Sequence, residues 1–160
     1  MEGLNVIFLL NAQPPVRLVL LRRAANKKFA PNMYTGIGGK MEPGETITGA
    51  VQRELKEETG LETPLHEFAR VWVNDEKVLY YFWGIHRSSS LPLCTEGTLE
   101  WVDAHDVLEK DVIPTTRDLL IEWKARNFDT AHSFTIMLRR DDAHDIYSQV
   151  THRDVREGLH

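Results

Sequence analysis

The segment "ETITGAVQRELKEETG" (45–60) decides how the chain folds around it. Good helix formers fill this segment apart from one internal glycine, and Gly60 is a typical residue for the end of a helix. Glu45 and Thr46 both carry side-chain oxygens, so either one can cap the start. We therefore predict a helix that begins after this pair and ends before Gly60.

The apolar face of this predicted helix turns acidic in its last two turns. At about 100° per residue, Glu54 and Glu58 fall in the middle of the apolar face, with Glu57 beside them. An ionised carboxylate in an apolar environment is costly unless a cation accompanies it. Arg53 and Lys56 are two nearby side chains that can pair with the carboxylates. Three carboxylates about one turn apart equally suit a hard divalent cation such as Mg²⁺ or Mn²⁺. The helix by itself leaves both interpretations open.

The sequence around this helix resembles the signature of the Nudix hydrolase family. That signature reads Gly, five residues, Glu, seven residues, Arg-Glu, an aliphatic residue, one residue, Glu-Glu, one residue, Gly and an aliphatic residue. The matching positions here are Gly39, Glu45, Arg53, Glu54, Leu55, Glu57, Glu58, Gly60 and Leu61. The resemblance implies an α+β fold: an α/β/α sandwich in which helices flank a mixed β-sheet.

The resemblance also implies an enzyme, a Mg²⁺-dependent (or Mn²⁺-dependent) hydrolase of nucleoside diphosphates linked to another group. Carried onto this chain, the implied metal ligands are the carbonyl of Gly38 and the carboxylates of Glu54, Glu57 and Glu58. Arg53 and Glu45 correspond to partners that hold the loop and the helix together by charge. The resemblance therefore turns the acidic face into a predicted metal site.

Members of the family differ in which carboxylate takes the proton from the attacking water. Glu54 is one candidate, and Glu96 in "CTEGTLEW" (94–101) is the other, because related enzymes place a Glu on the loop before a similar strand. Glu100 is nearer to that strand's Trp, but we interpret it as a surface residue. The predicted catalytic residues are Arg53, Glu54, Glu57 and Glu96.

Two stretches, "PNMYTGIGGKMEPGE" (31–45) and "EGTLEWV" (96–102), resemble the MutT-type branch of the family. That branch converts nucleoside triphosphates, including oxidised purine triphosphates such as 8-oxo-dGTP, to monophosphates and pyrophosphate. Lys40 either contacts the phosphates or is a solvated loop lysine, while Phe29 and Asn32 are candidates for contacting the base. Alternatives are a Nudix hydrolase of dinucleoside polyphosphates or nucleotide sugars, and a non-catalytic nucleotide-binding module of the same fold.

Hydrophobic periodicity and turn residues predict the remaining elements. The expected strands cover 5–10, 16–22, 33–39, 66–73, 77–86, 99–102 and 133–138, and two further helices cover 103–110 and 114–127. We expect one Nudix domain over residues 1–145 and a polar C-terminal tail over 146–160, loosely ordered toward its end.

Composition sets further limits. The 160 residues carry a net charge of −5, so we expect a small nucleotide substrate and no polymeric nucleic acid. The short apolar runs are well below the roughly 20 residues of a membrane span. The single cysteine excludes an internal disulfide and fits a reducing cytoplasm, where we expect the protein to act. The sequence leaves open whether the chain forms a homodimer.

Overall fold

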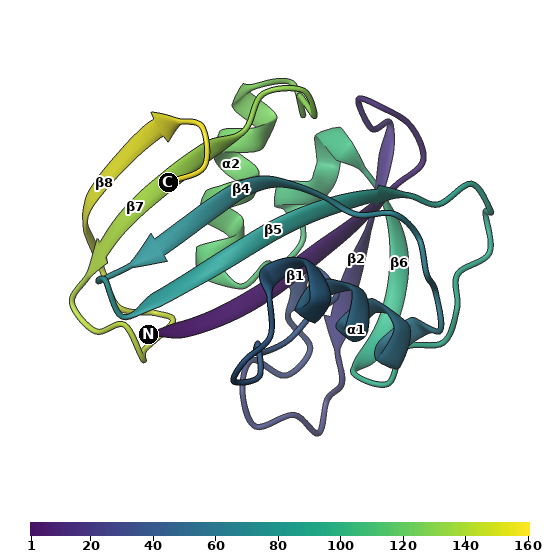
Figure 1. Cartoon of the computed structure of the whole chain (residues 1–160), viewed down its shortest axis with the longest axis horizontal. Helices are drawn as coiled ribbons and strands as arrows, with labels where there is room; N and C mark the ends of the chain where they lie inside the picture. Colours follow the sequence, from purple (N-terminus) through teal and green to yellow (C-terminus); the bar gives the residue numbers. More distant parts are fainter.

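The computed structural model describes all 160 residues, which form an eight-stranded sheet with helices on both faces (Figure 1). Its strands are β1 (Glu2–Leu10), β2 (Arg17–Arg23), β3 (Tyr34–Thr35), β4 (His66–Val73), β5 (Lys77–Ile85), β6 (Gly97–Asp103), β7 (Phe134–Arg140) and β8 (Val150–Glu157). Its helices are α1 (Ile47–Thr59), the 3₁₀ helix η1 (Ala104–Glu109) and α2 (Pro114–Ala125). None of these helices combines the length and the apolar character needed to cross a membrane.

The sheet is mixed, as predicted. The strand order is β3-β2-β1-β5-β4-β7-β8, and β6 also pairs with β2. The pairs β1–β5 and β4–β7 are parallel, whereas the remaining pairs are antiparallel. The strands predicted over 66–73 and 77–86 are present as β4 and β5, which form an antiparallel hairpin.

Alternating side chains of the sheet supply two separate cores. On one face, Ile7 and Leu9 of β1 pack with Val51 and Leu55 of α1. On the other face, Phe8 belongs to the larger core that α2 and η1 cover. There the indole of Trp123 stacks on Phe68, with ring centroids 4.3 Å apart. This arrangement confirms the predicted α/β/α sandwich.

A break between β1 and β2 positions the site. The two strands pair only where Leu10 lies opposite Leu18. Beyond that point, residues 34–40 lie between them: β3 pairs with β2, while Ile37 and Lys40 form bridges to β1. Gly38 must lie very close to β1, because a Cβ added to it would be 1.9 Å from the carbonyl oxygen of Asn5. The start of the segment that matches the Nudix signature, at Gly39, is therefore held against the centre of the sheet.

Two expectations from the sequence were wrong. The end of the chain is not a loosely ordered tail, because β8 pairs antiparallel with β7 along its length. Pairing satisfies the backbone groups of β7, which otherwise would be an open edge, and Arg126 of α2 reinforces it through Glu157 at 2.7 Å. The strand expected over 33–39 is wrong as well, because β3 covers only Tyr34–Thr35 and the chain then turns to bridge β1. The helix expected over 103–110 is present as the 3₁₀ helix η1. The domain limit at residue 145 stays a prediction.

We predict that a chain ending at Gln149 unfolds more easily than the full chain. It loses several backbone hydrogen bonds to β7, each worth roughly 0.5–1.5 kcal/mol, so the free energy of unfolding should fall by at least about 2 kcal/mol. Urea titration followed by circular dichroism measures this difference. The matched control is Asp154→Asn, which keeps β8 and removes one half-buried charge with its ion pair to Arg156. It should change stability by less than about 1 kcal/mol. Equal stability of the truncated and full chains would contradict the prediction.

Candidate active site

Helix α1 begins and ends on residues that the sequence identifies. The hydroxyl of Thr46 accepts a hydrogen bond from the backbone N–H of Gly49 at 3.0 Å, so Thr46 rather than Glu45 is the capping residue. Gly60 adopts a left-handed conformation, and its N–H donates to the carbonyl of Lys56 at 2.9 Å. These two ends fix the register of the acidic face relative to the loop before it.

Arg53 connects this helix to the preceding loop. Its guanidinium donates to both carboxylate oxygens of Glu45, at 2.7 and 2.8 Å, and holds the pKa of Glu45 at about 2. The remaining nitrogen, Nη1, lies 3.1 Å from both Glu54 and Glu57. A further, longer contact reaches the carbonyl of Lys40 at 3.4 Å. The orienting pair expected from the sequence is thus formed, and Arg53 also contacts two of the predicted metal ligands.

The two carboxylates in the middle of the helix face are buried. Glu54 and Glu58 are each only 8% exposed, whereas Glu57 lies at the surface. Burial, followed by the neighbouring Glu54 carboxylate, raises the pKa of Glu58 to about 8. Arg53 does not reach Glu58, whose other neighbour is the thiol of Cys94 at 3.8 Å. Glu58 therefore lacks a cationic partner among the side chains of the chain.

The predicted metal ligands line one polar pocket with no hydrophobic residue in its wall. Five acidic side chains line it, against three basic ones. The acidic residues are Glu42, Glu54, Glu57, Glu58 and Glu96, and the basic ones are Arg23, Lys40 and Arg53. Gly38 and Gly39 also contribute to the wall, and the Gly38 carbonyl accepts no hydrogen bond from the protein.

This donor set suits a hard divalent cation, because it consists of oxygen atoms and carries an excess of negative charge. The side chains are not gathered around a single point, however: no three of them have their ligating atoms placed to hold one ion. Arg53 accounts for part of this, since it draws Glu57 toward itself.

The loop before β6 brings Glu96 into the same pocket. A backbone hydrogen bond from Thr95 to the carbonyl of Glu58, at 3.3 Å, ties this loop to the end of α1. Lys27, from the loop after β2, forms an ion pair with Glu96. Glu100 does not line the pocket and instead contacts the hydroxyl of Tyr34, whose pKa is raised by burial and by that contact. The structure thus places Glu96, and not Glu100, among the other carboxylates.

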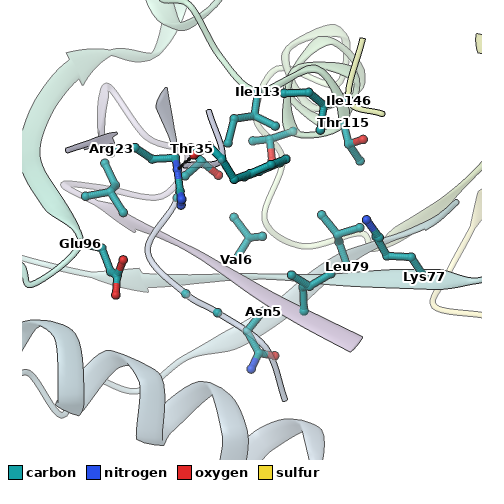
Figure 2. A pocket seen from close by; sticks show the side chains of 17 residues that line it. Asn5, Val6, Arg23, Thr35, Lys77, Leu79, Glu96, Ile113, Thr115 and Ile146 are labelled. Carbon is teal, nitrogen blue, oxygen red and sulfur yellow. Dashed lines mark hydrogen bonds between the residues drawn. The ribbon is translucent and has the colours of Figure 1, made fainter. Parts of the chain in front are cut away.

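An apolar cavity adjoins the polar pocket on the α2 side of the sheet (Figure 2). The two share Arg23, Gly38, Gly39 and Glu96 in their walls. Its apolar side chains come from three strands, from the residue before α2 and from two loops: Leu4 and Val6 of β1, Leu21 of β2, Leu79 of β5, Ile113, Phe29 and Ile146. The chain therefore carries a charged pocket that opens directly into an apolar one.

The structure separates the three candidate substrate-binding residues. Lys40 lines the polar pocket, and Phe29 lines the apolar cavity, where the guanidinium of Arg23 lies over its ring at 5.5 Å. Asn32 lines neither of them; it adopts a left-handed conformation and borders a different hollow beside Cys94. The aromatic residues Tyr81 and Trp123 are fully buried in the core, as expected.

Sequence reasoning missed several residues of the cavity. Lys77, Thr115 and Thr116 line it, but a lone lysine at the start of a strand and two threonines at the start of a helix give no signal of a site. Arg23 directly follows the strand predicted over 16–22 and belongs to a basic stretch, which gives no signal of a site. Asn5 is 2% exposed and neither amide atom has a hydrogen-bond partner. Its side chain points to the α1 side of β1, opposite to Val6 (Figure 2).

The raised pKa of Glu58 predicts a pH-dependent stability in EDTA. Its ordinary pKa of 4.5 in the unfolded chain rises to about 8 in the folded chain. The folded state therefore binds this proton more tightly, and stability should fall as the pH rises from about 4.5 to about 8.

The variant Glu58→Gln stays neutral and should avoid this loss. Urea unfolding of both proteins should give similar stabilities at pH 4.5 and a more stable variant at pH 8.5. A constant difference across this range would show that Glu58 ionises normally. Mg²⁺ added at pH 8.5 should narrow the gap by stabilising the ionised wild type only.

Comparisons with known proteins agree with this geometry. The Nudix domain model matches residues 3–123. The 8-oxo-dGTP diphosphatase of Escherichia coli (strain K12) is 33% identical over 112 residues, which cover 67% of this chain and 85% of that protein. The NAD-capped RNA hydrolase NudC of Chromobacterium violaceum is 38% identical over 66 residues, covering 36% of this chain and 25% of that protein.

Among solved structures, the MutT protein of Bacillus halodurans superposes with a TM-score of 0.71 over 97% of both chains. At 18% identity, that likeness supports the fold alone. The family model covers most of the chain, and the match lies on the segment that carries the acidic helix. The chain therefore belongs to the Nudix hydrolase family, whose members cleave nucleotide substrates.

Proposed function

We propose that this hydrolase converts a nucleoside triphosphate, with an oxidised purine triphosphate such as 8-oxo-dGTP as the leading candidate, to the monophosphate and pyrophosphate. The observation that carries the proposal is the direct opening of the carboxylate pocket into an apolar cavity. A nucleotide has the same division, with charged phosphates at one end and a flat, largely apolar base at the other. The likeness to the 8-oxo-dGTP diphosphatase of Escherichia coli supports the same substrate class.

The polar pocket is the place for the phosphates. Because it is lined by more acids than bases, polyphosphate binding needs additional positive charge. We assign this role to Mg²⁺, held by Glu54, Glu57, Glu58 and the Gly38 carbonyl, with Mn²⁺ as an alternative. When bound, the cation neutralises phosphate oxygens and polarises the attacking water. Lys40 adds a point charge at the edge of the same pocket.

The chain's own residues then direct the hydrolysis. The oxygen of water attacks one of the two phosphorus atoms that share the bridging oxygen between the α- and β-phosphates. The bond from that phosphorus to the bridging oxygen breaks, and the monophosphate and pyrophosphate separate. A carboxylate takes the proton of the water. Glu96 suits this role because it lines both the phosphate pocket and the cavity, whereas Glu54 is buried and hydrogen-bonded to Arg53. Lys27 must leave Glu96 for the carboxylate to accept a proton, and an incoming phosphate offers Lys27 another partner.

Other nucleotides remain as alternatives with their own support. Relatives named NAD-capped RNA hydrolases match only short segments, and this chain spans a quarter or less of two of them. Dinucleoside polyphosphates and nucleotide sugars also place a diphosphate between two groups. The proposal includes a small-molecule substrate and a cytoplasmic location.

A panel of substrates tests the function. We expect Mg²⁺-dependent release of pyrophosphate and monophosphate from at least one nucleoside triphosphate, and no turnover in EDTA. The panel includes 8-oxo-dGTP, the standard triphosphates, a dinucleoside polyphosphate, ADP-ribose, a nucleotide sugar and NAD. Products are separated by ion-exchange chromatography. Preferred cleavage of a non-triphosphate member would replace the proposed substrate by that member.

We also predict that Glu57→Gln lowers kcat at least about a hundredfold, as expected when a key catalytic group is lost. The folded structure should persist, because Glu57 is exposed and its only ion pair is with Arg53, which keeps Glu45. Glu62→Gln is the matched control, since this exposed carboxylate pairs with Lys56 outside the pocket. Calorimetric titration with Mn²⁺ should show weaker binding to the Glu57 variant only. Normal activity of that variant would remove Glu57 from the metal site.

A further inference from the structure

The end of the apolar cavity that lies away from the carboxylates contains one charged side chain, Lys77 (Figure 2). We propose that Lys77 determines base specificity by donating a hydrogen bond to a carbonyl oxygen of the nucleobase. Bases with a carbonyl at that edge are then preferred over bases with an amino group there. This inference rests on the proposed function, because it assumes that the cavity holds the nucleoside.

The position of Lys77 follows from the sheet. It is the first residue of β5 and lies opposite Glu2 of the parallel strand β1. Its side chain shares a face with Leu79, two residues on, and both line the cavity. Figure 2 shows the amine directed toward Thr115 and Ile146, whereas Glu96 lies at the opposite end. A lysine on this face is therefore directed into the cavity by the strand period of two.

The phosphate pocket sets the orientation of the nucleotide. Phosphates beside Glu54 and Glu57 place the sugar near the shared residues Arg23 and Gly38. The base then extends into the cavity toward Lys77. Its faces meet apolar walls, so that its polar edge is the part that reaches the far end. There the groups available to recognise it are an ammonium and the hydroxyls of α2.

The one charged group at this end, Lys77, offers hydrogen-bond donors only. An ammonium group has three donors and no acceptor. The ammonium of Lys77 donates to the carbonyl of Ala143 at 3.4 Å, a long bond that leaves its other donors available. The hydroxyl of Thr116 is engaged by Tyr81 at 3.0 Å. A carbonyl oxygen of a base satisfies the free donors, whereas an exocyclic amino group meets a second donor and loses its own hydrogen bond to water.

The loop between β7 and β8 holds the lysine in place. It supplies both Ala143 and the cavity residue Ile146. Arg140, at its start, donates to Asp118 of α2 at 3.1 Å and to the carbonyl of Ser148 at 2.9 Å. This loop lies outside residues 3–123, which match the family model.

The experiment compares kcat/KM for pairs of triphosphates that differ at one position. The pair dITP and dATP differs by a carbonyl or an amino group at position 6, and 8-oxo-dATP and dATP differ by the carbonyl at position 8. For wild type, at least one carbonyl-bearing member should be preferred about ten- to a hundredfold. Lys77→Met should reduce that preference to within about threefold, and Lys77→Arg should retain it. Lys124→Met is the matched control, because Lys124 also donates to a backbone carbonyl, away from the cavity.

Each outcome has a defined meaning. A loss of preference in Lys77→Met but not in Lys124→Met supports the proposal, and the pair that changes identifies the position that is read. An equal decrease of kcat/KM for all substrates would show that Lys77 only fastens the β7–β8 loop, which overturns the proposal. Unchanged ratios overturn it as well. Absence of triphosphate hydrolysis by wild type is a different result, because it rejects the proposed substrate class itself.

Discussion

Arg53 and Glu45 form the contact on which the charged half of the site depends. Two short hydrogen bonds join the helix to the loop that precedes it, and this bidentate geometry holds both partners in one orientation. Because the Nε–Nη2 edge of the guanidinium is fixed on Glu45, the remaining nitrogen, Nη1, contacts both Glu54 and Glu57. A lysine in place of Arg53 would keep the charge but could not hold Glu45 by two parallel hydrogen bonds, since it has no planar fork.

The same contact leaves Glu58 without a cation of its own. Its carboxylate is buried beside Glu54 and has a pKa of about 8. Such a pair of carboxylates is costly to ionise in the absence of positive charge. The divalent cation that we propose for this site would lower that cost, and its binding would then be coupled to the protonation of Glu58.

The break between β1 and β2 joins this charged pocket to the apolar cavity. Residues 34–40 fill the break, and Gly38 and Gly39 approach β1 so closely that they form part of both walls. The carboxylates of α1 lie on one side of the sheet, and the cavity beside α2 lies on the other. The charged pocket and the apolar cavity therefore meet at these glycines, which line both of them.

The sequence by itself determined the helix, its C-terminal glycine, the charge pattern on its face and the family, because each depends on residues close together in the chain. The same local information left open whether Arg53 or a cation compensates the carboxylates. Only the tertiary structure decided that Arg53 reaches Glu54 and Glu57 but not Glu58. It also decided that Glu96 and Lys77 lie at opposite ends of one cavity, and that the C-terminal segment forms a strand. These features arise from strands that pair across long sequence separations. The spacing of residues along the chain does not specify which strands become neighbours.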